Sequence, residues 1–312
     1  MNLLEHKNKI ALVTSLLLLI ILISGAFFIL SLGNNQTYEV NNSAARIIAL
    51  QQFQNLDIKA KAYIVYDATN KQIVYAKNET AQLPLASLTK IMSAVVALDI
   101  ATKDTIIEVT PNSSFNPNDR NALMPGKWKL GDLLRLTLVA SSNSGINTIS
   151  DELSTIQNFL GGEKHFLELM NTKAVALGLH QTYFLNESGL DVDSSLAGGY
   201  GSPIDVAKLF DFAVAKDPDI FGATRYDSIM INSTDGTTER ALNTNNTVSQ
   251  IRGLVSSKTG FTDLAQGNLA IAFDIDQKTR VIVVVLGSTQ DGRFTDTDQL
   301  TRASLAYYSL IK

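Results

Sequence analysis

The chain has 312 residues, a formal net charge of −4 and a sequence pI near 5.4, a size that allows one large domain or two small ones. It has no long run of Lys or Arg, which argues against a nucleic-acid partner. The absence of cysteine excludes thiol catalysis, cysteine–zinc sites and a disulfide framework.

A long apolar segment lies near the start of the chain. Residues 10–32 contain no charge, and a helix of about this length spans the hydrocarbon core of a bilayer, about 30 Å thick. Lys7 and Lys9 precede the segment, so the positive-inside rule places residues 1–9 in the cytoplasm. A cleaved signal peptide is the alternative, although its apolar region is usually about 7–15 residues long. We predict an uncleaved anchor; both interpretations place the rest of the chain outside the cytoplasm.

The remainder of the chain predicts a tether followed by one folded domain. Residues 33–57 begin with an asparagine-rich stretch, and we expect them to form an extracytoplasmic tether. Apolar segments bounded by turn residues predict strands at 58–67, 72–76, 254–261, 268–273 and 280–286. Helical periodicity follows Pro84 and recurs at 130–140, 146–159, 165–177, 204–215 and 303–310. Strands at both ends with helices between them predict an α/β domain at 58–312, with an antiparallel sheet and a helical insert.

A serine and a lysine lie one helical turn apart in the stretch after Pro84. Ile91 and Val95 continue the helical spacing, which places Ser87 in the first turn and Lys90 on the same face. An amine beside a hydroxyl can remove its proton and create a nucleophile. The pattern alone is weak, because an ordinary surface helix can carry the same two residues.

Two further motifs strengthen this interpretation. Ser141 and Asn143 form a Ser-x-Asn motif directly after a predicted helix, and Lys258, Thr259 and Gly260 form Lys-Thr-Gly on a predicted strand. The order Ser-x-x-Lys, Ser-x-Asn and Lys-Thr-Gly is typical of penicillin-interacting serine enzymes.

Longer stretches around these motifs resemble one family. Residues 84–94, 166–171, 186–191, 243–245 and 258–263 are similar to segments of the D-alanyl-D-alanine carboxypeptidases, the low-molecular-weight penicillin-binding proteins. The resemblance covers roughly residues 58–312. It implies the penicillin-binding, serine β-lactamase-like transpeptidase fold, in which helices cover an antiparallel sheet of about five strands.

Two departures from the family pattern bear on substrate fit and rate. The run Ser141-Ser142-Asn143-Ser144-Gly145 stands where the family usually has Ser-Gly-Asn-Asp-Ala. Glu187 and Ser188 follow Asn186 where the family often has Asn-Pro.

The resemblance implies a catalytic role for three residues. Ser87 would attack the carbonyl between the last two D-alanines of a peptide and form an acyl-enzyme. Neutral Lys90 would be the base, although the pKa of a free lysine is about 10.4 and must fall for action near neutrality. Lys258 would be the second cation that lowers this pKa, and Ser141 would relay a proton to the departing D-alanine.

The resemblance also implies the groups that bind substrate. Asn143 would hold a substrate amide, and Lys258, Thr259 and Gly260 would form the wall that receives the terminal carboxylate. The backbone N–H groups of Ser87 and Phe261 would form an oxyanion hole, worth about 3–4 kcal/mol in hydrolases. Arg293 would bind the carboxylate through its guanidinium; the alternative is a solvated loop charge.

The sequence therefore predicts a serine-type D-Ala-D-Ala carboxypeptidase that acts on peptidoglycan stem peptides. We expect β-lactams to be covalent inhibitors, a single-pass attachment to the bacterial cell membrane, and no metal or organic cofactor. His6, His165 and His180 form no His-Glu-x-x-His motif, which argues against a zinc peptidase. Three alternatives remain: a D,D-endopeptidase of cross-links, a β-lactamase with Glu187 as deacylating base, and a catalytically dead wall-binding protein.

Overall fold

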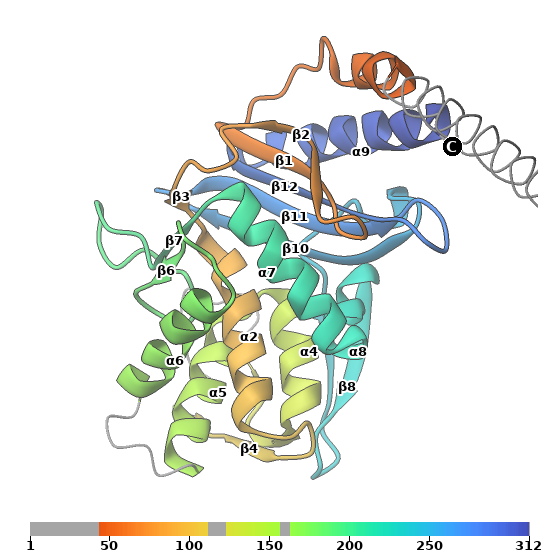
Figure 1. Ribbon diagram of the computed structural model, residues 1–312. Helices are drawn as coiled ribbons and strands as arrows, with labels where there is room; N and C mark the ends of the chain where they lie inside the picture. Colours follow the sequence, from red (N-terminus) through yellow and green to blue (C-terminus); the bar gives the residue numbers. More distant parts are fainter. Residues whose placement is uncertain (1–43, 112–122, 157–162, 312) are drawn as a thin grey trace, which may run out of the picture. The chain divides into compact units, whose positions relative to one another are not determined.

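The computed structural model describes residues 44–111, 123–156 and 163–311 (Figure 1). The chain divides into two compact units, Met1–Gln52 with Ala306–Lys312, and Phe53–Leu305. In the described part of the first unit, residues 44–50 form a helix. The predicted cytoplasmic end, the predicted anchor and the start of the predicted tether lie outside the described residues. Within the described ranges, no helix is both long and apolar enough to cross a membrane.

The second unit is built on a five-stranded sheet in the order β10-β11-β12-β1-β2, with every neighbouring pair antiparallel. Its strands are β1 (Ala62–Asp67), β2 (Gln72–Lys77), β10 (Leu254–Thr262), β11 (Gln266–Asp274) and β12 (Arg280–Ser288). An early and a late segment of the chain meet where β1 pairs with β12, from Ala62 opposite Leu286 to Asp67 opposite Val281. The predicted antiparallel sheet built from both chain ends is confirmed.

Helices cover both faces of this sheet. The helices are α2 (Thr89–Ile100), α4 (Leu130–Ala140), α5 (Asn143–Ile156), α6 (Glu163–Ala176), α7 (Pro203–Lys216), α8 (Pro218–Gly222) and α9 (Gly292–Leu310). Short 3₁₀ turns are η1 (Gln51–Phe53), η2 (Ala86–Leu88), η3 (Ala223–Arg225) and η4 (Val248–Gln250). Figure 1 shows α7 on one face and the start of α9 on the other. Residues on both faces of β12 are therefore buried, which explains its continuous run of apolar side chains.

Helix α2 is the centre of the helical half. It contacts α4, α5, α6 and α7, and every residue from Thr89 to Ala97 is buried. The sequence is apolar almost all round the helix, as a helix surrounded by others requires. Helix α7 starts where the sequence supplies a cap: the Ser202 hydroxyl accepts from the Asp205 amide at 3.3 Å, and Pro203 takes the first helical position.

Three small sheets complete the unit. They are β3 (Leu83–Pro84), β7 (Gly199–Gly201) and β6 (Tyr183–Phe184); β4 (Ile106–Val109) with β5 (Gly126–Lys129); and β8 (Ser228–Asn232) with β9 (Thr238–Leu242). The sequence did not predict them, because strands of two to five residues are too short for a clear alternation.

Two predicted boundaries were wrong. Strand β1 begins at Ala62 rather than residue 58, because the amides of Lys59 and Ala60 donate to the Asp296 carboxylate at 3.1 and 2.9 Å instead of a neighbouring strand. Helix α9 begins at Gly292 rather than residue 303. Its first half is rich in polar residues, among them the exposed Thr295, which conceals the helical periodicity.

Candidate active site

Ser87 lies in the 3₁₀ turn η2, directly before α2 rather than inside its first turn. The buried Asn268 on β11 holds the backbone that leads into this turn. Its side-chain amide donates to the carbonyls of Pro84 and Leu85 at 2.9 and 3.1 Å, and its oxygen accepts from the Gly287 amide at 2.8 Å. The turn is thus fixed to the sheet while Ser87 stays partly exposed.

Lys90 is fully buried and its amine faces Ser87. Its Nζ lies 3.0 Å from Ser87 Oγ, 2.6 Å from Asn143 Oδ1 and 2.8 Å from the Ser188 carbonyl oxygen. Two of these partners are carbonyl oxygens and can only accept hydrogen bonds. A neutral amine has two N–H groups for those carbonyls and one lone pair, which is then directed at the Ser87 hydroxyl. This arrangement suits an amine that removes the serine proton.

The three partners of Lys90 named above are neutral. A carboxylate in the position of the Ser188 carbonyl would favour the charged amine, whereas a carbonyl does so much less. With the Asn147 amide turned so that its nitrogen donates, that nitrogen lies 2.8 Å from both the Glu187 carboxylate and the Asn143 carbonyl oxygen. Glu187, the residue that a β-lactamase interpretation requires as a base, is therefore held by α5.

Lys258 of β10 and Ser141 at the end of α4 are in contact. Lys258 is buried on β10 and donates to Ser141 Oγ at 2.7 Å and to the Thr259 carbonyl at 2.9 Å. Ser141 ends α4 in the left-handed conformation, with φ of 56°, which turns it out of the helix. Burial, and then the charges of Lys90 and Arg293, hold the pKa of Lys258 well below its usual value.

The rest of the Lys-Thr-Gly motif brings β10 against the turn that carries Ser87. Thr259 Oγ1 lies 2.6 Å from Thr244 Oγ1. A Cβ at Gly260 would lie 2.8 Å from the Leu85 carbonyl oxygen and 3.3 Å from the Ser87 nitrogen, so only glycine permits this approach. Phe261 follows on the same strand with its side chain partly exposed.

Arg293 lies in the first turn of α9 and not in a loop. It is 8% exposed, and its Nη1 donates to the Gly260 carbonyl at 2.8 Å. Burial lowers the pKa of its guanidinium. Lys258 and Arg293 are thus two buried cationic side chains near Lys90, and no ion pair joins Lys258 or Arg293 to a carboxylate of the described residues. Such a group favours an anionic ligand.

A loop between β6 and β7 closes the site from the side of α2. The Asn186 side chain accepts from the Gly189 amide at 2.7 Å, and Asp191 accepts from the Thr262 hydroxyl at 2.9 Å. Ser188 places its carbonyl against Lys90 from this loop. The sequence analysis did not predict this acceptor, because every residue has a main-chain carbonyl and its type does not show where that carbonyl points. The Asn-x-x-Gly spacing at Asn186 and Gly189 was the only sign of the turn that places it.

Hydrogen bonds and close packing therefore join the predicted residues into one cluster of Ser87, Lys90, Ser141, Asn143, Lys258, Thr259, Gly260 and Arg293. Their roles in a reaction remain predictions. No group of His, Cys, Asp or Glu in the described ranges could hold a metal ion.

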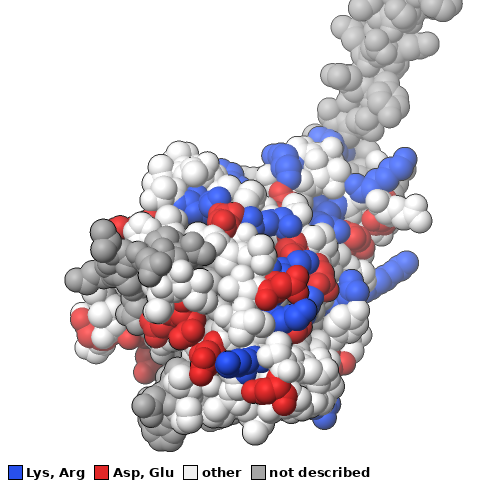
Figure 2. Space-filling model, turned by 90° about the horizontal axis from the view of Figure 1, so that it is seen from below, with Lys and Arg blue, Asp and Glu red and all other residues white. Residues whose placement is uncertain are grey.

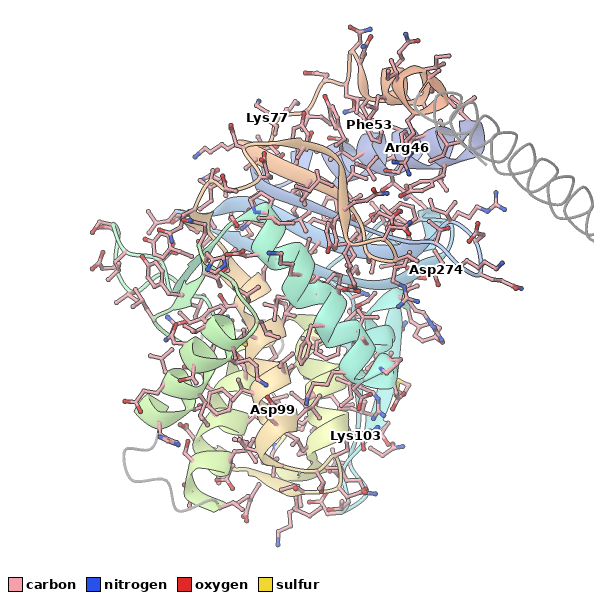
Figure 3. All side chains as sticks on the ribbon, viewed as in Figure 1. Arg46, Phe53, Lys77, Asp99, Lys103 and Asp274 are labelled. Carbon is pink, nitrogen blue, oxygen red and sulfur yellow. The ribbon has the colours of Figure 1, made fainter. Side chains whose placement is uncertain are left out.

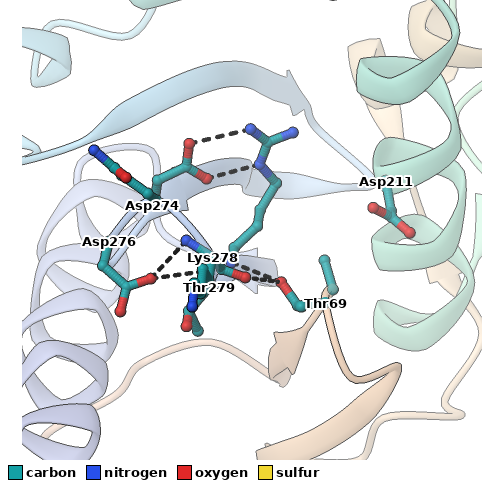
Figure 4. Close-up of a pocket in the computed structure, with 9 residues that line it drawn as sticks. Thr69, Asp211, Asp274, Asp276, Lys278 and Thr279 are labelled. Carbon is teal, nitrogen blue, oxygen red and sulfur yellow. Dashed lines mark hydrogen bonds and ion pairs between the residues drawn. The ribbon is translucent and has the colours of Figure 1, made fainter. Parts of the chain in front are cut away.

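Other charged regions of the surface have local partners. A hollow of about 260 Å³ at the turn between β11 and β12 contains several carboxylates (Figure 4). There Asp274 pairs with Arg280 at 2.8 Å, and Asp276 accepts from the backbone amides of Lys278 and Thr279, so these carboxylates hold the turn. On the face drawn in Figure 2, basic and acidic side chains are mixed rather than separated by sign.

The known proteins that are similar to this chain are D-alanyl-D-alanine peptidases. The family model of D-alanyl-D-alanine carboxypeptidases matches residues 49–290. The carboxypeptidase DacD of Escherichia coli is 30% identical over 259 residues, covering 79% of this chain and 63% of DacD. This chain therefore spans less than two thirds of that relative. A D-alanyl-D-alanine endopeptidase of E. coli is 23% identical and covers 83% of this chain and 81% of its own length.

A solved structure agrees with these relatives. Penicillin-binding protein D2 of Listeria monocytogenes, in an ampicillin-bound form, has a TM-score of 0.67 to this chain. The two are 28% identical, and the match covers 80% of this chain and 98% of the other.

Proposed function

Because this chain belongs to the D-alanyl-D-alanine carboxypeptidase family, we propose that it is a serine peptidase that removes the terminal D-alanine from peptidoglycan stem peptides. The observation that carries this proposal is the position of Lys90 Nζ, which lies 3.0 Å from Ser87 Oγ and also contacts two carbonyl oxygens. A merely wall-binding protein does not need an amine positioned to accept the proton of that hydroxyl.

Acylation follows from this geometry. Ser87 Oγ attacks the carbonyl carbon of the penultimate D-alanine, and its proton passes to Lys90 Nζ. The backbone N–H groups of Ser87 and Phe261 stabilise the oxyanion. When the C–N bond breaks, the departing amine takes a proton from the Ser141 hydroxyl, which Lys258 contacts at 2.7 Å. Lys258 returns a proton to the Ser141 oxygen. Water then attacks the acyl-enzyme, Lys90 gives its proton back to the Ser87 oxygen, and the proton released by the water restores Lys258.

The buried cations select a substrate with a free carboxylate. Lys258 directly precedes Thr259 on β10 and contacts its carbonyl, and Arg293 contacts the Gly260 carbonyl. A terminal carboxylate bound at Thr259 would compensate their charge, while Asn143 holds the amide on the other side of the scissile bond. The same cations would attract the carboxylate of a β-lactam, so we expect penicillins to acylate Ser87. The ampicillin-bound form of the Listeria relative supports this expectation.

We further propose that the enzyme acts outside the bacterial cytoplasm as a single-pass membrane protein. The support is the uncharged segment 10–32 with Lys7 and Lys9 before it. Residues 33–57 would be the tether, and residues 58–312 the catalytic domain.

A test uses the full chain purified in detergent. A peptide ending in D-Ala-D-Ala is supplied, and mass spectrometry follows release of one alanine, with Ser87→Ala as the control. Release that disappears in Ser87→Ala supports the proposal. If a labelled penicillin forms no covalent adduct with the unmodified chain and no alanine is released, the proposal is wrong.

A further inference from the structure

Helix α2 carries a buried hydroxyl that the proposed reaction does not use. Ser93 is 0% exposed and lies in an apolar run, with the fully buried Met92 before it and Ala94 after it. A hydroxyl at such a place costs free energy unless it makes a hydrogen bond. The partner of Ser93 therefore indicates what the residue does.

The hydroxyl of Ser93 is directed at the loop between β6 and β7. Its Oγ lies 2.6 Å from the Glu187 carbonyl oxygen, but 3.5 Å from the Thr89 carbonyl oxygen and 3.6 Å from Met170 Sδ. A serine has one O–H to donate, and such a bond is usually about 2.7–2.8 Å long. The proton thus goes to Glu187, and the bond that a serine inside a helix often makes to the carbonyl four residues earlier is given up.

Lys90 and Ser93 contact two successive carbonyl groups of this loop. Ser93 follows Lys90 by three residues, which places both side chains on the same face of α2. Lys90 contacts the Ser188 carbonyl at 2.8 Å, and Ser93 contacts the carbonyl of the residue before it, Glu187. Because consecutive carbonyl groups are joined by one residue, fixing the first limits the movement of the second relative to Lys90.

The sequence of the loop increases the importance of this contact. A proline fixes its own φ, and neither Glu187 nor Ser188 does so. The Asn186 side chain accepts from the Gly189 amide at 2.7 Å and from the Ser188 hydroxyl at 3.2 Å, but these bonds lie within the loop. The bond from Ser93 joins the loop to α2, the helix that carries Lys90.

We propose that Ser93 is a positioning residue of the reaction. By holding the Glu187 carbonyl, it keeps the Ser188 carbonyl where Lys90 donates to it. The inference rests on the proposed function of Ser87 and deepens it. Ser93 keeps its own proton throughout and does not touch the substrate, since it is fully buried.

The effect of Ser93 concerns the lone pair of Lys90. In the neutral amine, the Ser188 carbonyl and Asn143 Oδ1 take the two N–H groups, and the lone pair is directed at Ser87 Oγ. If the Ser188 carbonyl moves away, its N–H can turn toward the Ser87 oxygen instead. The lone pair then no longer faces the proton that must be removed, so acylation slows while binding of the ligand is unaffected.

Stopped-flow acylation of the full chain by penicillin measures these two quantities separately. We expect Ser93→Ala to lower the rate constant of acylation at least tenfold and to leave the dissociation constant of the non-covalent complex unchanged. Ser93→Thr keeps a hydroxyl and should restore most of the rate. Ser304→Ala is the matched control, because Ser304 is also fully buried and donates to the Leu300 carbonyl at 2.7 Å, within α9; its rate constant should not change.

Hydrogen exchange tests the contact without depending on activity. The backbone amides of residues 186–191 should exchange faster in Ser93→Ala than in the unmodified chain, and should not change in Ser304→Ala. An unchanged exchange rate overturns the proposal. An unchanged rate constant of acylation in Ser93→Ala also overturns it, as does a Ser93→Thr variant as slow as Ser93→Ala, or an effect on the dissociation constant alone.

Failure of the proposed function gives a different result. The unmodified chain would then form no penicillin adduct at Ser87, whereas Ser93→Ala would still raise the exchange of residues 186–191.

Discussion

Lys258 on β10 donates to the Ser141 hydroxyl at the end of α4 at 2.7 Å, although 117 residues separate the two in the chain. This bond joins the sheet to the helical half. Lys258 also lies near Lys90 and Arg293, and burial together with the charges of these two groups lowers its pKa. We expect a buried cation at this place to reduce the stability of the free protein and a substrate carboxylate to offset that cost.

Replacing Lys258 with methionine should stabilise the fold and abolish function. Removal of a buried, uncompensated cation should raise the free energy of unfolding at pH 7 by roughly 1–3 kcal/mol. Each kcal/mol corresponds to about 2–4 °C in Tm for a domain of this size. Penicillin acylation should fall at least a hundredfold. Thermal melts and adduct formation measure the two effects, and Lys278→Met, which changes an exposed lysine, should alter neither.

The same substitution should change the pH dependence of stability. Because the pKa of Lys258 is lowered in the fold, the folded protein binds fewer protons there than the unfolded chain between the lowered pKa and about 10.4. Its stability must rise with pH across that window. The advantage of Lys258→Met should therefore be largest below the lowered pKa and vanish above about pH 10.4. An advantage that is constant with pH would contradict the electrostatic origin.

An ion-pair cluster at the far end of α2 should contribute to stability (Figure 3). Asp99 contacts Lys173 of α6 at 2.6 Å and Lys216 of α7 at 2.5 Å. Burial acts to raise the pKa of Asp99, but the hydrogen bonds from the two lysines outweigh it and lower the pKa. Asp99→Asn should cost about 1 kcal/mol at pH 7, since the group is only partly exposed to solvent.

Asp99 stabilises the folded protein, whereas the buried charge of Lys258 destabilises it, and the two effects differ in how they depend on pH. The contribution of Asp99 is present above its unfolded pKa of about 3.9 and is lost as pH falls through the lower folded value. Urea unfolding should therefore show a larger difference between the two proteins at pH 7 than near pH 3. Asp104→Asn, at an exposed pair with Lys129, should produce no measurable change. Equal effects of the two variants would show that α2, α6 and α7 are not joined by Asp99.

The sequence revealed those parts of the site that are carried by side chains in ordered motifs. Ser87, Lys90, Asn143 and Lys258 could be found because the reaction requires their residue types at those places. The sheet could be found because its strands bury both faces. The Ser188 carbonyl could not, because any residue supplies it, and the start of α9 could not, because its polar surface conceals the helix.

Asn268 should control both stability and the geometry of the nucleophile. Asn268→Ala leaves the carbonyls of Pro84 and Leu85 and the Gly287 amide without their buried partner, which should cost about 2–3 kcal/mol. Asn268→Asp should be worse, because it turns a carboxylate toward two carbonyl oxygens. Both variants should slow penicillin acylation of Ser87.

A control separates these two effects of Asn268. Asn171 makes the same kind of bonds, to the Leu167 carbonyl and to both backbone groups of Phe184, but it does not hold the η2 turn. Asn171→Ala should lose similar stability, measured by urea unfolding, and keep its acylation rate at a temperature where it remains folded. Equal loss of acylation in both variants would refute a specific role of Asn268.

Gly189 should be required for the reaction because there is no room for a side chain beside it, and not only because of its backbone conformation. Its φ is 78°, and a Cβ there would lie 1.9 Å from the Ala86 carbonyl oxygen, next to Ser87. Gly236 has a φ of 92° but nothing within 4 Å of the same position. Alanine at either site pays the cost of the left-handed region, about 1–2 kcal/mol. Gly189→Ala must in addition displace the η2 turn, so its acylation rate should fall at least tenfold, whereas that of Gly236→Ala should stay unchanged. Stopped-flow acylation with thermal melts of both variants measures this difference; equal rates in the two would mean that the loop can move away from Ala86 without disturbing Ser87.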